Sequence, residues 1–165
     1  MHDKAVQRLL DIEEIKQLKG RYCLCVAKED WTTFESLFTN DLQFITNDGV
    51  VHEPRDDFMA FHKKNIQDTK LWGAVYCHTP IITITGSDSA SGIWAMEDLH
   101  VWPNAGGPRV GHHAHGHYHE DYVRLHEGWR FRRIKVVTNR MDPLEGGFGH
   151  RPTNTNILIS GESLT

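Results

Sequence analysis

Three side chains that can exchange or donate a proton stand in apolar stretches of this chain. Tyr22 lies in a helical pattern, His78 just precedes a strand-like run, and Asp98 lies inside the apolar run 92–102. Ionisable groups in core-forming segments are costly to bury without a partner. If the three side chains converge, they form an acid/base site in an apolar pocket.

Each of these residues also has a purely structural interpretation. His78 fits a histidine that caps a strand end through a backbone hydrogen bond, and Tyr22 fits a core tyrosine whose hydroxyl reaches a carbonyl. Asp98 is harder to explain in this way, because a carboxylate among tryptophans and methionine needs a partner. Either His100, on the same strand face, or His78 would serve.

The strand that carries Asp98 has two apolar faces. Alternate residues share a face, so one face holds Trp94, Met96, Asp98, His100 and Trp102. The other face is also largely apolar, which predicts that the strand is covered on both sides. One cover would be a helix-lined pocket and the other a subunit interface, and the pattern leaves open which face is which.

A second cluster is the histidine run of residues 112–119. His113, His115, His117 and His119 fall on one strand face, and His112 falls on the other. Histidines at i and i+2 on a strand can chelate a metal, with a neighbour such as His100 as third ligand. The alternative is an exposed face or a subunit interface whose histidines titrate near neutral pH.

The elements that must position these residues are helices first and strands later. Helical spacing predicts a helix over 3–27, with Ile15, Leu18, Tyr22 and Cys25 on its buried stripe, and Asp30 is a suitable cap for a short second helix. Further elements are expected as a hairpin over 42–52, a third helix from Pro54, and long strands over 73–85, 90–102, 109–125 and 129–138. This order indicates an α+β fold.

The composition narrows the function classes. The 165 residues fit one domain, expected over 1–145, with a loop-like tail over 146–165 that offers one short strand at 156–160. A net charge of −4 argues against nucleic-acid binding. Three cysteines without a disulfide framework, no signal peptide and no membrane-spanning run favour a cytoplasmic protein with no membrane partner.

Several motifs carry a family resemblance, which covers roughly residues 8–142. The opening resembles SnoaL-like proteins of the nuclear transport factor 2-like superfamily, and the middle resembles the bile-acid and scytalone dehydratases. The motifs are Ile12 to Tyr22, Asp30-Trp31, Leu37-Phe38, His78-Thr79-Pro80, Gly92-Ile93-Trp94, Glu97-Asp98, Glu120 to Arg124 and Gly128 to Phe131.

The resemblance implies a cone-shaped α+β barrel around a deep apolar pocket and a reaction that needs no metal or cofactor. His78 would be the general base, Asp98 its support, and Tyr22 the donor to the substrate oxygen. The family's usual aspartate late on the first helix is replaced here by Ala27, and Asp30 is the nearest substitute. The resemblance also implies a homo-oligomer, with a trimer favoured over a dimer.

We therefore expect a dehydratase-like lyase or isomerase acting on a hydrophobic, cyclic small molecule. Ligand contacts are expected from Trp94, Met96, His100, Trp102 and Tyr118, and from Arg140 if the ligand is anionic; the alternative for Arg140 is a surface ion pair. Two other hypotheses remain. One is a non-catalytic binding protein with the same pocket, favoured by Ala27, and the other is a metal-dependent enzyme using the strand of His112–His119.

Overall fold

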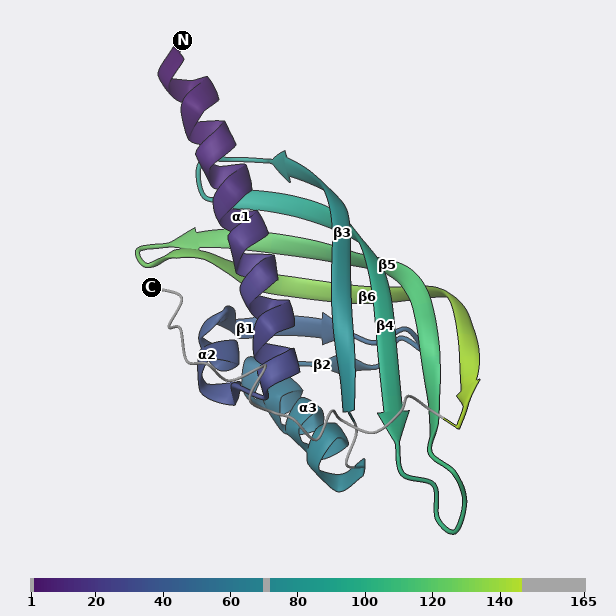
Figure 1. Cartoon of the computed structure of the whole chain (residues 1–165). Coiled ribbons are helices and arrows are strands. Elements are labelled where there is room, and N and C mark those ends of the chain that lie inside the picture. Colours follow the sequence, from purple (N-terminus) through teal and green to yellow (C-terminus); the bar gives the residue numbers. More distant parts are fainter. Residues whose placement is uncertain (1, 70–71, 147–165) are drawn as a thin grey trace, which may run out of the picture.

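The computed structural model describes residues 2–69 and 72–146. These residues form three helices and six strands, whose arrangement can be followed in Figure 1. The elements are α1 (His2–Lys28), α2 (Trp31–Ser36), β1 (Phe38–Ile45), β2 (Val51–His52), α3 (Arg55–Thr69), β3 (Trp72–Ile84), β4 (Ser89–Trp102), β5 (Val110–Leu125) and β6 (Gly128–Glu145).

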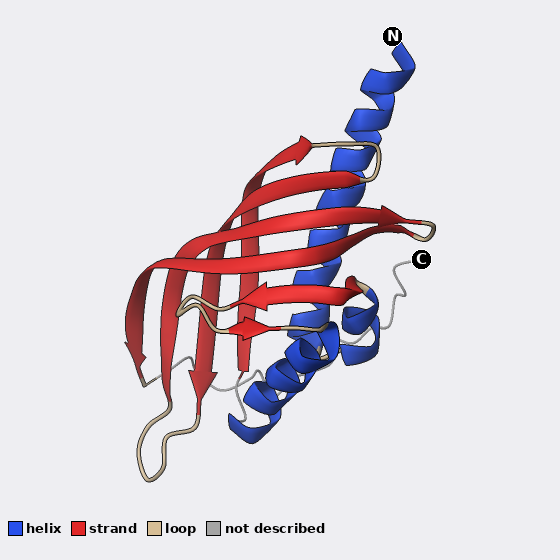
Figure 2. Ribbon diagram, turned by 180° about the vertical axis from the view of Figure 1, so that it is seen from behind, coloured by secondary structure: helices blue, strands red, loops and turns tan. Residues whose placement is uncertain are grey.

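The six strands form one curved sheet in the order β2-β1-β6-β5-β4-β3. Neighbouring strands are antiparallel except β1 and β6, which are parallel. The sheet does not close, and the helices lie on its concave side (Figures 1 and 2). α1 packs along β3, and α3 packs against β1. The predicted α+β class with helices inside a curved sheet is confirmed.

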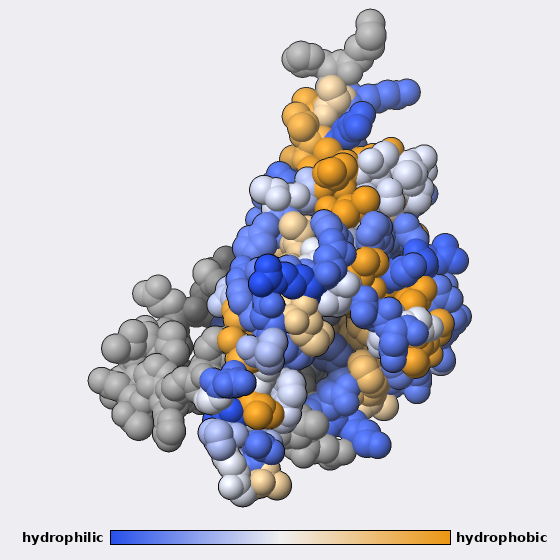
Figure 3. All heavy atoms as spheres, turned by 90° about the vertical axis from the view of Figure 1, so that its right-hand side faces the viewer, coloured by the Kyte–Doolittle hydropathy of each residue, from blue (hydrophilic) through white to orange (hydrophobic). Residues whose placement is uncertain are grey.

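The buried stripe of α1 agrees with the helical spacing. Ile15, Leu18, Tyr22 and Cys25 are all 5% exposed or less. The apolar residues at the beginning of α1 are exposed instead of buried, because the helix begins beyond the sheet (Figure 1). Apolar side chains gather on the surface near this end (Figure 3), and they are Val6, Leu9 and Leu10, exposed by 49%, 68% and 52%. None of the described helices is apolar enough over sufficient length to cross a membrane.

An aromatic core fixes α2 and α3 against β1. The ring centroids of Phe34 and Phe38 are 4.9 Å apart, and those of Phe44 and Phe58 are 4.6 Å apart. Phe131 on β6 joins this cluster and is fully buried. Tilted and edge-on pairs at these distances favour the packed state beyond simple area burial. The cluster therefore holds α3 at a fixed height over the sheet.

Two strand boundaries differ from the sequence prediction. β1 begins at Phe38, earlier than expected, because its first residues pair with β6 as a parallel strand. β6 continues to Glu145, pairing with the histidine-rich part of β5 across a bulge between His115 and Gly116. The end of β6 is largely exposed and carries no apolar alternation that predicts a strand. The strand expected at 156–160 lies outside the described residues.

Candidate active site

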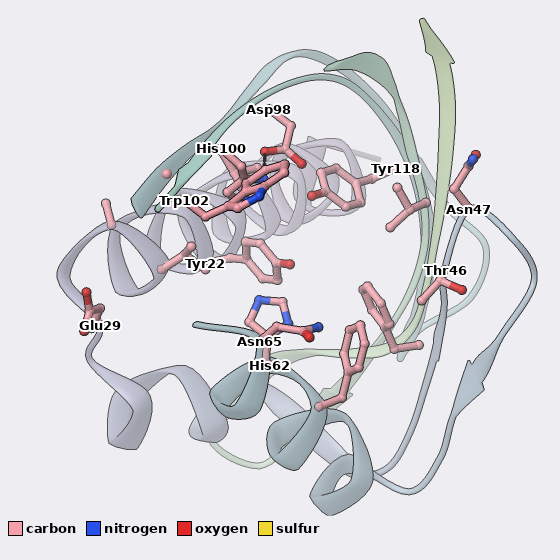
Figure 4. Close-up of a pocket in the computed structure, with 17 residues that line it drawn as sticks. Tyr22, Glu29, Thr46, Asn47, His62, Asn65, Asp98, His100, Trp102 and Tyr118 are labelled. Carbon is pink, nitrogen blue, oxygen red and sulfur yellow. Dashed lines mark ion pairs between the residues drawn. The ribbon is translucent and has the colours of Figure 1, made fainter. Parts of the chain in front are cut away.

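A cavity of about 460 Å³ opens between the end of α1, α3 and the concave face of the sheet. Its apolar wall includes Val26, Phe44, Phe61, Val75 and Val136. Polar side chains also line it, as the close-up in Figure 4 shows. They include Tyr22, Glu29, His62, Asn65, Asp98, His100 and Tyr118. A few polar groups in an apolar wall are typical of sites for small molecules.

Asp98 and His100 form a contact at one end of the cavity. The carboxylate Oδ1 of Asp98 lies 2.6 Å from Nδ1 of His100, and both side chains are 18% exposed. Figure 4 marks this ion pair beside Trp102. Asp98, His100 and Trp102 alternate along β4, so the face that carries them is the concave one. Of the two partners considered for Asp98, the structure selects His100.

Two tyrosines face the cavity from opposite elements. Tyr22 on α1 is 2% exposed and Tyr118 on β5 is 4% exposed, and their ring centroids are 6.2 Å apart. Both hydroxyls point toward the middle of the cavity (Figure 4). Burial raises the pKa of Tyr22 and of Tyr118 well above the ordinary value of a phenol. Both hydroxyls are therefore neutral hydrogen-bond donors at any working pH.

His62 on α3 also lines the cavity (Figure 4). Its ring stacks on Phe34 at 5.5 Å and lies 4.9 Å from Phe58. Burial in this aromatic surrounding lowers the pKa of His62 to about 4, and nearby His100 acts in the same direction. His62 is thus a neutral imidazole near neutral pH. His62 was not among the site residues predicted from the sequence, although its place in the apolar helix pattern with Phe58 and Phe61 was an available signal.

A buried ion pair packs against the rings of Tyr22 and Tyr118. Lys19 and Glu120 are 1% and 2% exposed and form an ion pair through Nζ and Oε1. The ammonium lies 3.7 Å from the Tyr118 ring centroid and 4.3 Å from that of Tyr22. Burial lowers the pKa of Lys19, but the Glu120 carboxylate, together with Cys77 and Cys23, raises it, and the net shift is upward. The lysine therefore stays charged and holds both rings in place.

His78 is not part of this cavity. It lies three residues after Val75 on β3, and Val75 is the register partner of Asp98 on the concave face. The odd spacing puts His78 on the convex face, where its side chain is 52% exposed and its Nε2 lies 3.5 Å from Glu97. The expected convergence of His78 with Asp98 is wrong, because strand alternation separates them.

Three other residues that were predicted to contact a ligand do not line the cavity. Arg140 lies on β6 with its side chain 71% exposed and pairs with Asp142, so the surface ion pair is the correct interpretation. Trp94 and Met96 share the concave face of β4 and are buried in the core, at 5% and 3% exposure, but they are not part of the cavity lining. Trp94 donates from Nε1 to the hydroxyl of Tyr122 over 2.8 Å.

No aspartate reaches the cavity from the end of α1. Ala27 is part of the lining and carries no polar side chain. Asp30 is exposed and caps α2 by accepting a hydrogen bond from the backbone N–H of Thr33 at 3.1 Å. The cap predicted from sequence is confirmed, and it commits Asp30 to α2 rather than to the site.

The side chains of the histidine run 112–119 lie on both faces of the sheet. His113 pairs with Glu97 on the convex side at 2.7 Å, and His115 is the register partner of Glu97 there. His112 lies on the concave side as the register partner of His100. The metal set predicted from the convex row plus His100 is therefore not assembled, because the sheet lies between them.

Several solved structures share this fold. A hexachlorocyclohexane dehydrochlorinase, LinA type 2, superposes with a TM-score of 0.79 at 15% identity over 90% of this chain and 99% of its own. A scytalone dehydratase candidate from Novosphingobium aromaticivorans gives 0.74 at 14% identity, over 92% and 94%. The Kfla4162 protein from Kribbella flavida gives 0.73 at 21%, over 82% and 95%.

At such low identities, the TM-scores establish a shared fold and nothing more. A family model for the SnoaL-like domain matches residues 7–135, which is well over half of the chain. The match begins within α1 and includes every residue named above in the cavity wall except Val136. The chain therefore belongs to the SnoaL-like domain family, within the nuclear transport factor 2-like superfamily.

Proposed function

We propose that this protein is a cofactor-independent lyase or isomerase that acts on a hydrophobic cyclic small molecule. The observation that carries the proposal is the contact between Asp98 and His100, at 2.6 Å, in a cavity that also receives two neutral tyrosine hydroxyls. A general base, a carboxylate beside it and a donor for a developing oxyanion are the parts that carbanion chemistry requires.

His100 is the proposed base in place of His78. Asp98 lies next to Nδ1 and so favours the tautomer with its proton on that nitrogen, which leaves the lone pair on Nε2. The His100 ring fills the place that a side chain at Gly73 would take, and His100 and Gly73 both line the cavity. A substrate carbon would approach Nε2 from the cavity side of the ring.

The proposed reaction begins with transfer of a proton from a carbon next to a carbonyl to Nε2 of His100. The electrons of the C–H bond form an enolate, whose oxygen accepts hydrogen bonds from Tyr22 and Tyr118. In an elimination, the enolate collapses to a new C=C bond, expels a hydroxide or halide, and the imidazolium returns its proton. In an isomerisation, the proton returns to a different carbon.

The size and lining of the cavity support a ring-containing substrate. A volume of about 460 Å³ lies within the usual range for small-molecule sites. Phe44, Phe61 and Trp102 present aromatic surface. His62 and Asn65 lie on the side opposite Asp98 (Figure 4), where they are placed to bind a second polar group of the substrate.

Hydrogen–deuterium exchange of a carbon acid tests this assignment. Cyclic ketones of increasing ring number are incubated with the protein in D₂O, and loss of the α-proton signal is followed by NMR. We expect catalysed exchange that drops by about 10²-fold or more in His100→Ala. His78→Ala is the matched control on the convex face and is expected to exchange normally. The reverse pattern would assign the base to His78.

A second candidate is a binding protein that uses the same cavity without turnover. Ala27 favours it, because the cavity lacks a carboxylate from the α1 helix at that position. This alternative predicts no exchange with any ketone in the wild-type protein. It also predicts that His100→Ala binds the same ligands with nearly unchanged affinity.

A homo-oligomer is also proposed, with a trimer favoured over a dimer. The exposed row of Val6, Leu9 and Leu10 on α1 supports it, because apolar surface of this kind commonly marks an interface. Light scattering across a concentration series gives the mass directly. A monomeric mass at high protein concentration would contradict the proposal.

A further inference from the structure

Three potential metal ligands from two strands meet at the end of the cavity wall. Asp98 and His100 come from β4 and His112 from β5, and one ligand atom of each lies within 4.8 Å of the other two. Nδ1 of His100 is 2.6 Å from Oδ1 of Asp98 and 3.4 Å from Nε2 of His112. We propose that these side chains bind a divalent transition-metal ion of the Zn²⁺, Fe²⁺ or Co²⁺ type.

The strand register produces this arrangement. His100 and His112 are direct partners in the antiparallel pairing of β4 and β5, and Asp98 is the next residue on the same face of β4. Side chains at such positions project in parallel from a sheet. The two imidazole rings have centroids 5.3 Å apart and cross at 82°. Their nitrogens therefore approach a common point without overlap of the rings.

One of the polar atoms at this point is under-satisfied by the protein alone. Oδ1 of Asp98 is buried, and no described residue donates a well-aligned hydrogen bond to it despite the short distance to His100. A buried carboxylate oxygen without a donor is costly. A cation bound between Asp98, His100 and His112 would satisfy this oxygen.

The type of ligand selects the class of metal. Two imidazoles and one carboxylate suit zinc or non-haem iron and their analogues, whereas Mg²⁺ and Ca²⁺ prefer oxygen-rich sites. Three protein ligands also leave coordination positions open, as in catalytic sites. The convex row is different, because His113 is already paired with Glu97 there and the sheet separates it from Asp98.

Metal binding and the proposed proton transfer exclude each other. A metal on Nδ1 of His100 leaves the ring hydrogen on Nε2, so this nitrogen donates a hydrogen bond and no longer accepts a proton. The metal also occupies Asp98. Binding itself does not depend on the proposed function, but its consequence does: the metal-loaded protein should lose the exchange activity of the metal-free protein.

Titration of the metal-free protein with Co²⁺ tests the site. We expect one strongly bound ion with visible absorption bands. His112→Asn should weaken its binding by more than about tenfold, since loss of even a supporting outer-shell group costs that much. His115→Asn, on the convex face of the same strand, is the matched control and should bind Co²⁺ as the wild type does. Thermal melts check that both variants are folded.

The outcomes separate the metal site from the enzyme. Equal binding by the wild type and His112→Asn, or loss of binding in His115→Asn, overturns the site and assigns the ion to the convex row. Co²⁺ binding that depends on His112, with no ketone exchange in either metal state, supports the site while the proposed function fails. Exchange that Zn²⁺ suppresses in the wild type and spares in the His112→Asn variant supports both.

Discussion

Gly73 lies directly opposite His100 in the pairing of β3 with β4, and the His100 ring occupies the place that a side chain at Gly73 would take. A Cβ at this position would lie 2.1 Å from Cδ2 and 2.8 Å from Nε2 of His100. It would also lie 2.7 Å from the carbonyl oxygen of Leu99. The position of the proposed base therefore depends on a glycine in the neighbouring strand.

Gly73→Ala is expected to displace the His100 ring from Asp98. The proposed exchange activity should fall by about 10²-fold, since it loses a positioned base, and overpacking should cost about 1–3 kcal/mol of stability. Ketone exchange and urea unfolding measure the two effects. If the variant is as active as the wild type, His100 is not the base in this position.

Gly20→Ala is a control in which replacing a glycine by alanine should raise the stability of the protein instead of lowering it. Gly20 is exposed within α1, and a Cβ there would meet nothing within 4 Å. Alanine in the middle of a helix is favoured over glycine by about 0.5–1 kcal/mol. The urea midpoint should therefore rise by the corresponding amount, with no change in exchange activity. A lower midpoint would mean that α1 is not a continuous helix at this residue.

The buried pair of Lys19 and Glu120 should be sensitive to the loss of one partner. Lys19→Met leaves the Glu120 carboxylate uncompensated in the core, with an expected cost of about 3–5 kcal/mol. The double variant with Glu120→Leu should cost much less than the two single changes added together. A double-mutant cycle of unfolding free energies measures the coupling, and simple additivity would show that the pair is not direct.

His62 predicts a decline of stability in mild acid. The pKa of His62 is about 4 in the folded protein and about 6.5 in an unfolded chain, so the unfolded state binds more protons between these values. Its contribution is complete above about pH 6.5, decreases as the pH falls, and levels off below about pH 4. The loss amounts to at most about 3 kcal/mol.

Unfolding free energies of the wild type and of His62→Phe between pH 4 and pH 7 isolate this contribution. The variant keeps an aromatic ring of similar size but has no proton to bind. Its stability should be less dependent on pH than that of the wild type. Parallel curves for the two proteins would show that His62 is not the group responsible.

The local part of this architecture was predictable from sequence. Helical spacing selected the buried stripe of Ile15, Leu18 and Tyr22, and strand alternation put Asp98 and His100 on one face. Both patterns act within a single element, where the geometry of the backbone fixes which side chains share a face.

The relations between elements were not predictable in the same way. His78 faces away from Asp98 because of the register between β3 and β4, which depends on contacts along both strands. Arg140 is part of β6 because that strand extends alongside β5 past a bulge. His62 reaches the cavity only through the aromatic packing of α3 on β1. The helix pattern that contains His62 is a periodic signal, but it does not say which strand the helix packs against, and the other two relations leave no periodic signal in the sequence.

The polar groups of the cavity come from elements far apart in the chain. β4 carries Asp98 and His100, whereas α3 carries Phe61, His62 and Asn65 on the opposite wall. Substitutions on α3 can therefore reshape the space for a ligand while the strand pair remains intact. In an evolving lineage, or in a directed-evolution library, this separation allows ligand preference to diverge while the reactive pair is inherited unchanged.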